Sequence, residues 1–246
     1  MLPEETREYK EKLFEEKART ILNYLRSQIR YDQKVIPRPF FIEITGSPDA
    51  GKSTTTEELD NALRKEGLRV WCPQEGAEVI RHIDRKTPLY NLRTGLYALN
   101  ILIDESVSHR YDIVVFNRCA FDMYCWMEDW FQEGKLTAKE RDMYQNFALS
   151  RFWVNNIDIA IFMVCDPPAI SIKRALRIAP IKKECGTTNY KKVTSLGEKY
   201  KSTYKILSGK YPQLHLIDTT KMEEQEMIDI VTTKILDALE AKTKSG

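Results

Sequence analysis

The stretch that decides the fold is Gly46-Ser-Pro-Asp-Ala-Gly51-Lys52-Ser53. It fits the phosphate-binding pattern G-x-x-x-x-G-K-[ST] without a mismatch. The glycines allow a tight turn that points successive backbone N–H groups at phosphate oxygens, and the following helix adds the positive end of its dipole. We therefore predict that a nucleoside triphosphate binds to residues 46–54, which are Gly46, Ser47, Pro48, Asp49, Ala50, Gly51, Lys52, Ser53 and Thr54.

Two side chains of this loop have predicted roles in holding ATP and Mg²⁺, the expected cofactors. Lys52 would bridge the β- and γ-phosphates, and the Ser53 hydroxyl would ligate Mg²⁺. The apolar run 40–45 leads into the loop and a helix-compatible run, 53–65, leads out of it, which is the context that the motif requires. A glycine-rich turn used only for folding is the alternative, but it does not require lysine and serine after the second glycine.

Composition narrows the class of protein. The 246 residues suit one α/β domain with a short extension. A net charge of +2, from 38 basic and 36 acidic residues, argues against bulk binding to nucleic acid, although a local basic patch leaves such binding open as a less favoured alternative. We find no apolar run long enough to span a membrane, no signal peptide, and five scattered cysteines without zinc-like spacing, so we expect a cytoplasmic protein with reduced thiols.

Hydrophobic periodicity divides the chain into two parts. Residues 1–35 form an amphipathic helical extension, which we expect to pack on the domain or on another subunit, with a partner-recognition helix as the alternative. Residues 36–246 form the main domain, where short apolar runs alternate with helices. This pattern predicts a three-layer α/β sandwich with a parallel sheet covered on both faces. The predicted strands are 40–45, 69–73, 113–117, 157–164 and 214–217, and a last helix is expected over 222–243.

Polar residues follow every predicted strand, at the edge where ligands bind in such sheets. Glu75 follows the second strand and could act as a general base or hold Mg²⁺ through water; an exposed glutamate in a turn is the alternative. Arg118 follows the third strand and could neutralise charge on a transferred phosphoryl group, with a surface salt bridge as the alternative. Asn117 stands where an acidic residue would hold Mg²⁺.

A basic stretch and two aromatic stretches complete the candidates. Arg174 and Arg177 lie three residues apart, so a helix would place both on one face, where they could clamp the γ-phosphate as a lid of about residues 173–190 closes. A solvated basic loop is the alternative. Residues 90–100 could form one wall of an acceptor pocket, whereas the aromatic cluster at 121–131 is interpreted as packing, with Asp122 and Glu128 as exceptions within it.

In their order along the chain, these motifs resemble the P-loop deoxynucleoside kinases and the related thymidylate kinases. The resemblance covers about residues 38–240 and includes the helical segments 128–144 and 190–204. It implies a five-stranded parallel sheet flanked by helices, often in dimers. It also implies that Glu75 is the base, that Arg118 is the arginine of the family's Glu-Arg-Ser or Asp-Arg motif, that Arg174 and Arg177 are lid arginines, and that residues 218–221 border the adenine. The chain departs from the motif at Asn117 and Cys119.

The sequence thus predicts a phosphotransferase that moves the γ-phosphate of ATP to a hydroxyl of a nucleoside-like small molecule. Three alternatives stay open: a nucleoside monophosphate kinase of the thymidylate type, a polynucleotide 5′-kinase, and a non-catalytic NTP-binding regulatory protein. The monophosphate acceptor is already ionised and needs no base. A polynucleotide would bind with a steep dependence on salt. A homodimer is implied only by the family resemblance.

Overall fold

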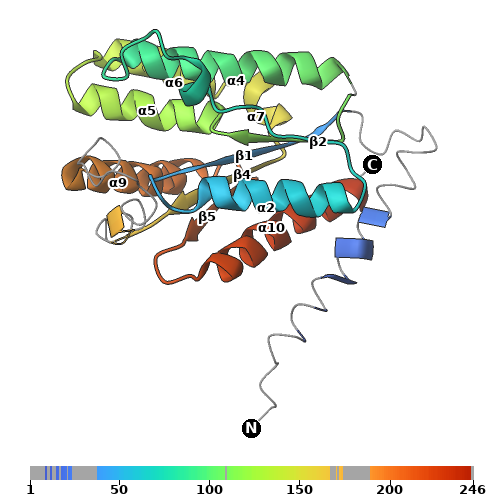
Figure 1. Ribbon diagram of the computed structural model, residues 1–246. Helices are drawn as coiled ribbons and strands as arrows, with labels where there is room; N and C mark the ends of the chain where they lie inside the picture. Colours follow the sequence, from blue (N-terminus) through green and yellow to red (C-terminus); the bar gives the residue numbers. More distant parts are fainter. Residues whose placement is uncertain are drawn as a thin grey trace.

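The computed structural model describes residues 9, 12, 15–16, 18–20, 22–23, 38–108, 110–166, 170, 172–173 and 189–244 (Figure 1). Its centre is a five-stranded sheet with the order β2-β3-β1-β4-β5, in which every pairing is parallel. The predicted parallel sheet is therefore confirmed. The strands are β1 (Phe40–Gly46), β2 (Val70–Trp71), β3 (Ile113–Asn117), β4 (Ile159–Val164) and β5 (Leu214–Asp218).

Alternation along the strands gives the sheet two apolar faces. In β1, Phe40, Ile42 and Ile44 belong to one core, whereas Phe41 belongs to the other. Successive side chains of a strand point to opposite faces, so a strand buried on both sides reads as a continuous apolar run. This explains why the sequence pattern identified β1 and β4 so clearly.

Helices cover both faces of the sheet (Figure 1). On one face, α2 (Lys52–Lys65) and α10 (Glu224–Lys244) pack together. On the other face, α4 (Pro88–Ser108), α5 (Ala120–Gln132) and α9 (Tyr190–Leu207) form the layer next to the sheet. The shorter helices are α3 (Gly76–Val79), α6 (Ala138–Ala148) and α7 (Arg151–Asn156). The three-layer sandwich predicted from the sequence is confirmed.

Two strands are shorter than their apolar runs. The edge strand β2 consists of only Val70 and Trp71, which pair with β3. In β4, the strand begins after Asp158, whose carboxylate accepts hydrogen bonds from the backbone N–H of Phe41 and from Arg38. Asp158 N also donates to Phe41 O across 2.9 Å, so the side chain of Asp158 adds a polar anchor to the backbone pairing at that end.

The N-terminal segment touches the core where the structure describes it. Its described residues are helical, and Leu22 is only 2% exposed, packed with the α2–α10 core beside Ala18. Phe14, Ile21, Leu25 and Ile29, which carry much of the amphipathic pattern, lie outside the described residues. Within the part of the chain that the structure describes, no helix combines the length and apolarity needed to cross a bilayer.

Candidate active site

The phosphate-binding loop has the backbone shape that its glycines make possible. Gly46 has φ +136° and Gly51 has φ +97°, and Asp49 between them has φ +53°. A Cβ on Gly46 would lie 1.8 Å from the carbonyl oxygen of Met163 in β4, so no side chain fits at this position. The loop therefore lies against the neighbouring strand, and Ser47 N donates to Met163 O across 2.9 Å.

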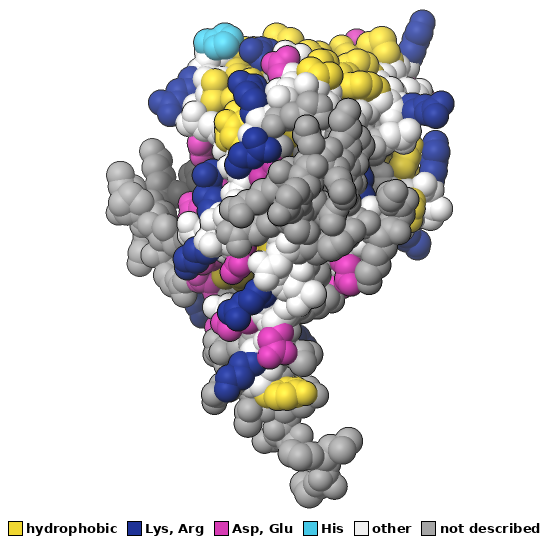
Figure 2. All heavy atoms as spheres, turned by 90° about the vertical axis from the view of Figure 1, so that its right-hand side faces the viewer, with side chains coloured by type: hydrophobic (Ala, Val, Ile, Leu, Met, Phe, Trp, Pro, Cys, Tyr) yellow, Lys and Arg dark blue, Asp and Glu magenta, His cyan; other side chains and the backbone are white. Residues whose placement is uncertain are grey.

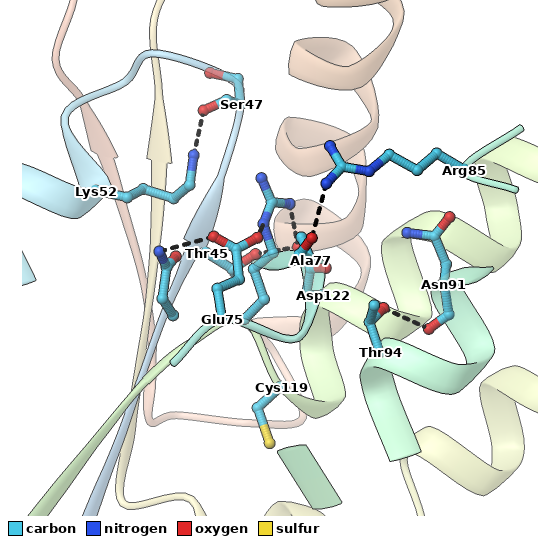
Figure 3. Close-up of polar contacts among 12 residues, drawn as sticks. Thr45, Ser47, Lys52, Glu75, Ala77, Arg85, Asn91, Thr94, Cys119 and Asp122 are labelled. Carbon is cyan, nitrogen blue, oxygen red and sulfur yellow. Dashed lines mark hydrogen bonds and ion pairs between the residues drawn. The ribbon is translucent and has the colours of Figure 1, made fainter. Parts of the chain in front are cut away.

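Lys52 begins α2 and bends back over the loop. Its ammonium Nζ donates to the backbone carbonyl of Ser47 across 2.7 Å (Figure 3). Burial, and after it the positive charge of Arg118, lower the pKa of Lys52 to about 7, while Glu75, Asp122 and Asp49 act in the opposite direction. An anionic ligand on the loop would restore the ordinary charge of this ammonium group.

The two hydroxyl groups at the ends of the loop differ in their surroundings. The hydroxyl of Ser47 accepts a hydrogen bond from the backbone N–H of Cys165, and its residue is fully buried, so it fixes the loop to the end of β4. Ser53, in contrast, is exposed on the first turn of α2. A side-chain oxygen intended for a metal–phosphate complex has to be accessible in this way. Thr219, after β5, donates to the carbonyl of Ala50 and ties the loop to the far side of the sheet.

Glu75 and Arg118 come together at the carboxyl ends of β2 and β3. Nε of Arg118 lies 2.8 Å from Oε1 of Glu75, and Nδ2 of Asn117 donates to Oε2 across 3.1 Å. Both side chains of the Asn117-Arg118 pair thus hold one carboxylate. Oδ1 of Asn117 is buried and has no hydrogen-bond partner among the residues that the structure describes.

Asp122 is the second carboxylate of the site. Its Oδ1 accepts three hydrogen bonds: from the Thr45 hydroxyl across 2.6 Å, from the Tyr200 hydroxyl across 2.6 Å, and from Nη1 of Arg118 across 3.0 Å. Asp122 thereby joins β1, α5 and α9 at one atom. Arg118 lies between this carboxylate and Glu75, so its guanidinium has a fixed direction.

The neighbouring groups keep the guanidinium of Arg118 protonated. Burial by itself would lower the pKa of the guanidinium, but Asp122, Tyr200 and Glu75 together raise it well above its usual value. The backbone of Arg118 is also unusual, since its φ of +75° lies in the left-handed region that arginine rarely adopts. Such a conformation persists only where the surroundings enforce it, and here Arg118 N donates to Ile44 O across 3.0 Å.

A cavity of about 710 Å³ opens beside these groups. This size is typical of a small-molecule site. Pro48 of the loop, Glu75, Arg118 and Asp122 line one part of it, together with Ala77 from α3. Figure 3 shows Glu75, Ala77 and Asp122 among these residues. The remaining lining mixes aromatic, apolar, polar and charged side chains and comes mainly from α4, α5, α9 and the loop before α4: Arg85, Lys86, Tyr90, Asn91, Thr94, Gly95, Cys119, Met123, Trp126, Trp130, Glu133, Lys135, Lys192 and Leu196.

The tryptophans of this wall have ordered polar partners. Nε1 of Trp130 donates to Oδ1 of the buried Asn91 across 3.0 Å. The ammonium groups of Lys135 and Lys192 lie over the Trp130 ring, at 4.2 and 5.2 Å from its centre. Aromatic residues interpreted from sequence as packing therefore also form a wall of the cavity. Trp130 is 3% exposed and also lines the cavity, so it belongs both to the core and to the cavity wall.

The oxygen donors near the loop fit Mg²⁺. This ion is usually held through one or two carboxylates together with substrate phosphates and water. The accessible hydroxyl of Ser53 and the Glu75 carboxylate are hard oxygen ligands of this kind. Among the described residues, no group of three or more His, Cys, Asp or Glu side chains is placed to bind a metal.

The structure brings together most residues singled out from the sequence. Lys52, Glu75 and Arg118 share one region, and of the predicted pocket wall at residues 90–100, Tyr90, Asn91, Thr94 and Gly95 line the cavity, whereas Arg93, Tyr97 and Asn100 do not. Glu128 instead forms an outlying ion pair with Arg141. Arg174, Arg177 and almost all of the predicted lid lie outside the described residues.

Several residues of the site were missed by sequence reasoning. Thr45 and Tyr200 gave no signal, because one lies in an apolar strand and the other in an amphipathic helix. Glu43 had a signal that went unused: it is a charged residue in the middle of a strand that is buried on both sides, and such a charge requires partners. Its carboxylate accepts backbone N–H groups at the start of α5.

No family model matches the sequence. The fold, however, is similar to solved structures of deoxyadenosine kinase from M. mycoides. The structure with bound dATP has a TM-score of 0.55 at 17% identity, over 80% of this chain and 98% of that chain. Those with products dCMP and a flexible dCDP, and with dCTP, have TM-scores of 0.57 and 0.54 at 15% and 16% identity, each over 80% of this chain and 100% of the other. The fold of the P-loop deoxynucleoside kinases, expected from the sequence, is confirmed.

Proposed function

We propose that this protein, which has the fold of the P-loop deoxynucleoside kinases, transfers the γ-phosphate of ATP to a hydroxyl of a nucleoside-like small molecule. The single observation that carries the proposal is that the phosphate-binding loop and the Glu75–Arg118 pair open onto the same cavity. The Glu75–Arg118 pair and Pro48 of the phosphate-binding loop line the same aromatic-walled cavity of about 710 Å³. ATP bound to the loop, as the phosphate donor, and a phosphate acceptor bound in the cavity would meet at these residues.

The proposed reaction uses the residues in fixed roles. The loop amides and Lys52 hold the β- and γ-phosphates. Ser53 and Glu75 would hold Mg²⁺, which would supply charge neutralisation. The acceptor oxygen forms a bond to the γ-phosphorus while the bond from that phosphorus to the β,γ-bridging oxygen breaks, and ADP leaves. Glu75 takes the acceptor proton, and Arg118 stabilises the charge on the transferred group. The sequence-predicted lid arginines, Arg174 and Arg177, complete this set.

The cavity wall supports a flat acceptor. Tyr90, Trp126 and Trp130 offer aromatic surface, and Asn91 and Thr94 offer polar atoms at the same wall. Aromatic rings can stack on any nucleobase, whereas amide and hydroxyl groups can hydrogen-bond to the base and fix its orientation. A nucleoside combines a flat base with a reacting hydroxyl, so its two parts match the two parts of the cavity.

The decisive experiment measures γ-phosphate transfer from Mg²⁺-ATP to a panel of nucleosides, nucleoside monophosphates and 5′-hydroxyl oligonucleotides. We expect transfer to nucleosides and a loss of several powers of ten with Lys52→Ala, because that change removes a charge-assisted phosphate contact. Transfer only to monophosphates or only to oligonucleotides would move the protein to one of those kinase classes. ATP binding without transfer to any acceptor would support the regulatory alternative and overturn the proposal.

Glu75→Gln separates a hydroxyl acceptor from a phosphate acceptor. With a hydroxyl acceptor, removal of the base should lower kcat by about 100-fold or more. With an acceptor phosphate, which is already ionised, the same change should cost less than about tenfold. Glu78→Gln is the matched control, since Glu78 is an exposed glutamate in α3, three residues away.

We also propose a homodimer that forms through a helical surface made by α4, α6 and α7. Figure 2 shows hydrophobic side chains gathered at the upper side of the molecule, where Figure 1 places α4 and α6. The exposed large hydrophobic residues of this layer include Ile103 and Val107 of α4, Phe147 of α6 and Phe152 of α7. Val107 is 74% exposed. Val107→Glu should shift the mass measured by analytical ultracentrifugation from dimer to monomer, and a monomeric wild-type protein would exclude the interface.

Cys72, Cys119 and Cys125 are free thiols, which supports the proposed cytoplasmic location, where thiols stay reduced.

A further inference from the structure

One buried carboxylate connects the donor loop with the acceptor side of the site. Glu43 lies on β1, three residues before Gly46, and is 0% exposed. Its Oε1 accepts the backbone N–H groups of Cys119 and Asp122, each across 2.9 Å, and Oε2 accepts that of Phe121 across 3.1 Å. These N–H groups belong to the first turn of α5, where a helix leaves its donors unsatisfied.

The start of α5 relies on this carboxylate. Cys119 is the N-cap residue of the helix and makes no side-chain capping bond. Helices usually receive this bond from a serine, threonine, aspartate or asparagine at the N-cap itself. Here the acceptor comes from another element, the strand that continues into the phosphate-binding loop. The positive end of the helix dipole favours a carboxylate at this place.

The anchored turn carries two residues of the site. Arg118 directly precedes Cys119 and has the strained φ of +75°, and its own N–H is held by Ile44, the neighbour of Glu43 on β1. Asp122 is anchored through its N–H by Glu43 and presents Oδ1 to Arg118. Consecutive residues of β1 therefore hold the backbone on both sides of Arg118.

We propose that Glu43 is a positioning residue for phosphoryl transfer, which acts by fixing the first turn of α5 and thereby Arg118 and Asp122 relative to the phosphate-binding loop. This inference rests on the proposed function. Glu43 does not line the cavity, so it acts only through these residues. Misplacement of a reacting geometry by about 1 Å can cost up to about 100-fold in rate.

The geometry requires three accepted hydrogen bonds, which the ionised carboxylate provides most simply. Burial, together with the charge of Asp122, raises the pKa of Glu43 to about 7, although the N–H bonds oppose this rise. The titratable groups that face it are Asp122 and Cys125 on α5 and Cys119 in the preceding turn, with Tyr200 of α9 reached through Asp122. On the neighbouring strands, Phe116 and Ala160 stand opposite and carry no charge. Burial raises the pKa of both thiols and of Tyr200 well above their usual values, so these groups stay neutral.

The pH profile is the test. In the wild-type protein, we expect kcat to rise with pH through about 7 as Glu43 ionises. Glu43→Gln should remove this rise and lower kcat at pH ~8 by about tenfold, with the KM for the acceptor changed less than about threefold. Glu43→Asp keeps the ionisation but shortens the reach, so it should keep the rise and lower kcat; this variant also covers the case in which Glu43→Gln does not fold.

Glu105→Gln is the matched control. Glu105 is also 0% exposed, but it binds Ser108 and Arg110 at the end of α4, away from the cavity. We expect this variant to lose stability and to keep the wild-type pH profile. The inference is overturned if the profiles of Glu43→Gln and the wild type superimpose, or if Glu43→Gln leaves kcat within about twofold while it lowers the Tm as Glu105→Gln does.

A second readout needs no phosphoryl transfer. Because the folded-state pKa of Glu43 is raised from 4.5 to about 7, its contribution to stability is fully present below pH 4.5 and is lost as the pH rises through 7. The Tm of the wild type should therefore fall relative to that of Glu43→Gln over this window. If no acceptor is phosphorylated, the proposed function fails, while this Tm difference still shows whether Glu43 is ionised at the start of α5. A constant Tm difference would overturn the inference.

Discussion

The side-chain amide of Asn117 donates a hydrogen bond to Oε2 of Glu75 across 3.1 Å, at the joined ends of β3 and β2. The carboxylate proposed as the base is thus held by a neutral donor on one oxygen and by Arg118 on the other. In the family that the chain resembles, an acidic residue stands at the place of Asn117. Compared with that family's motif, the site here lacks one carboxylate and has one more neutral donor beside Glu75.

Asn117→Asp should strengthen the use of Mg²⁺. The new carboxylate would stand next to that of Glu75, and carboxylates are the protein ligands through which Mg²⁺ is usually held. We expect the apparent affinity for Mg²⁺ in the transfer reaction to increase, measured as the Mg²⁺ concentration that gives half-maximal kcat. Asn100→Asp, at an exposed position of α4, is the control. An unchanged Mg²⁺ dependence in Asn117→Asp would mean that the side chain at position 117 does not face the metal.

ATP binding should take up a proton above neutral pH. The pKa of Lys52 is lowered to about 7 in the free protein, first by burial and then by Arg118, so the side chain is charged below this pH and neutral above it. Bound phosphates favour the ammonium form. Above pH 7, the Kd for ATP should therefore increase by about tenfold per pH unit, until the pKa of the complex is reached. Calorimetry in buffers of different ionisation enthalpy measures the uptake, and Lys52→Met should abolish it; pH-independent binding would contradict the assignment.

Gly46→Ala should destabilise the fold as well as the loop. The added Cβ would lie 1.8 Å from the backbone oxygen of Met163, and the φ of +136° is strained for any L side chain. We expect the free energy of unfolding to fall by about 3 kcal/mol or more. Gly197→Ala, inside α9 with no atom within 4 Å of the new Cβ, should instead stabilise by about 0.5–1 kcal/mol. Equal effects of the two changes in chemical denaturation would contradict this reading of the loop.

Asp129→Asn should break the contact between α5 and α9. The carboxylate is 0% exposed and pairs with the buried Lys199 and with Lys192. Lys192 lies in the first turn of α9 and lines the cavity. Removing one partner of a buried ion pair leaves uncompensated charge, so the free energy of unfolding should fall by about 3 kcal/mol. The neighbouring Glu128→Gln loses only a partly exposed pair with Arg141 at 3.5 Å and should cost less than about 1 kcal/mol. Urea denaturation of the two variants compares them directly.

The sequence by itself determined the architecture and the donor site. Apolar strands alternating with amphipathic helices define a covered parallel sheet, because both periodicities are local. The loop at residues 46–53 and the strand-end residues Glu75 and Arg118 were also visible, since parallel strands present their carboxyl ends at one edge. What local patterns cannot give is the length of an edge strand such as β2, which depends on its partner.

Only the tertiary structure decided how these residues work together. Glu43 and Asp122 are 79 positions apart, and Tyr200 is 78 from Asp122, yet they meet around Arg118. No periodicity connects such residues, because their contacts depend on how α5 and α9 pack against β1. The same packing makes Trp130 part of the cavity wall as well as of the core. The physical reason is that burial removes water from charged and aromatic groups alike, so their charge and their role follow from their neighbours in space.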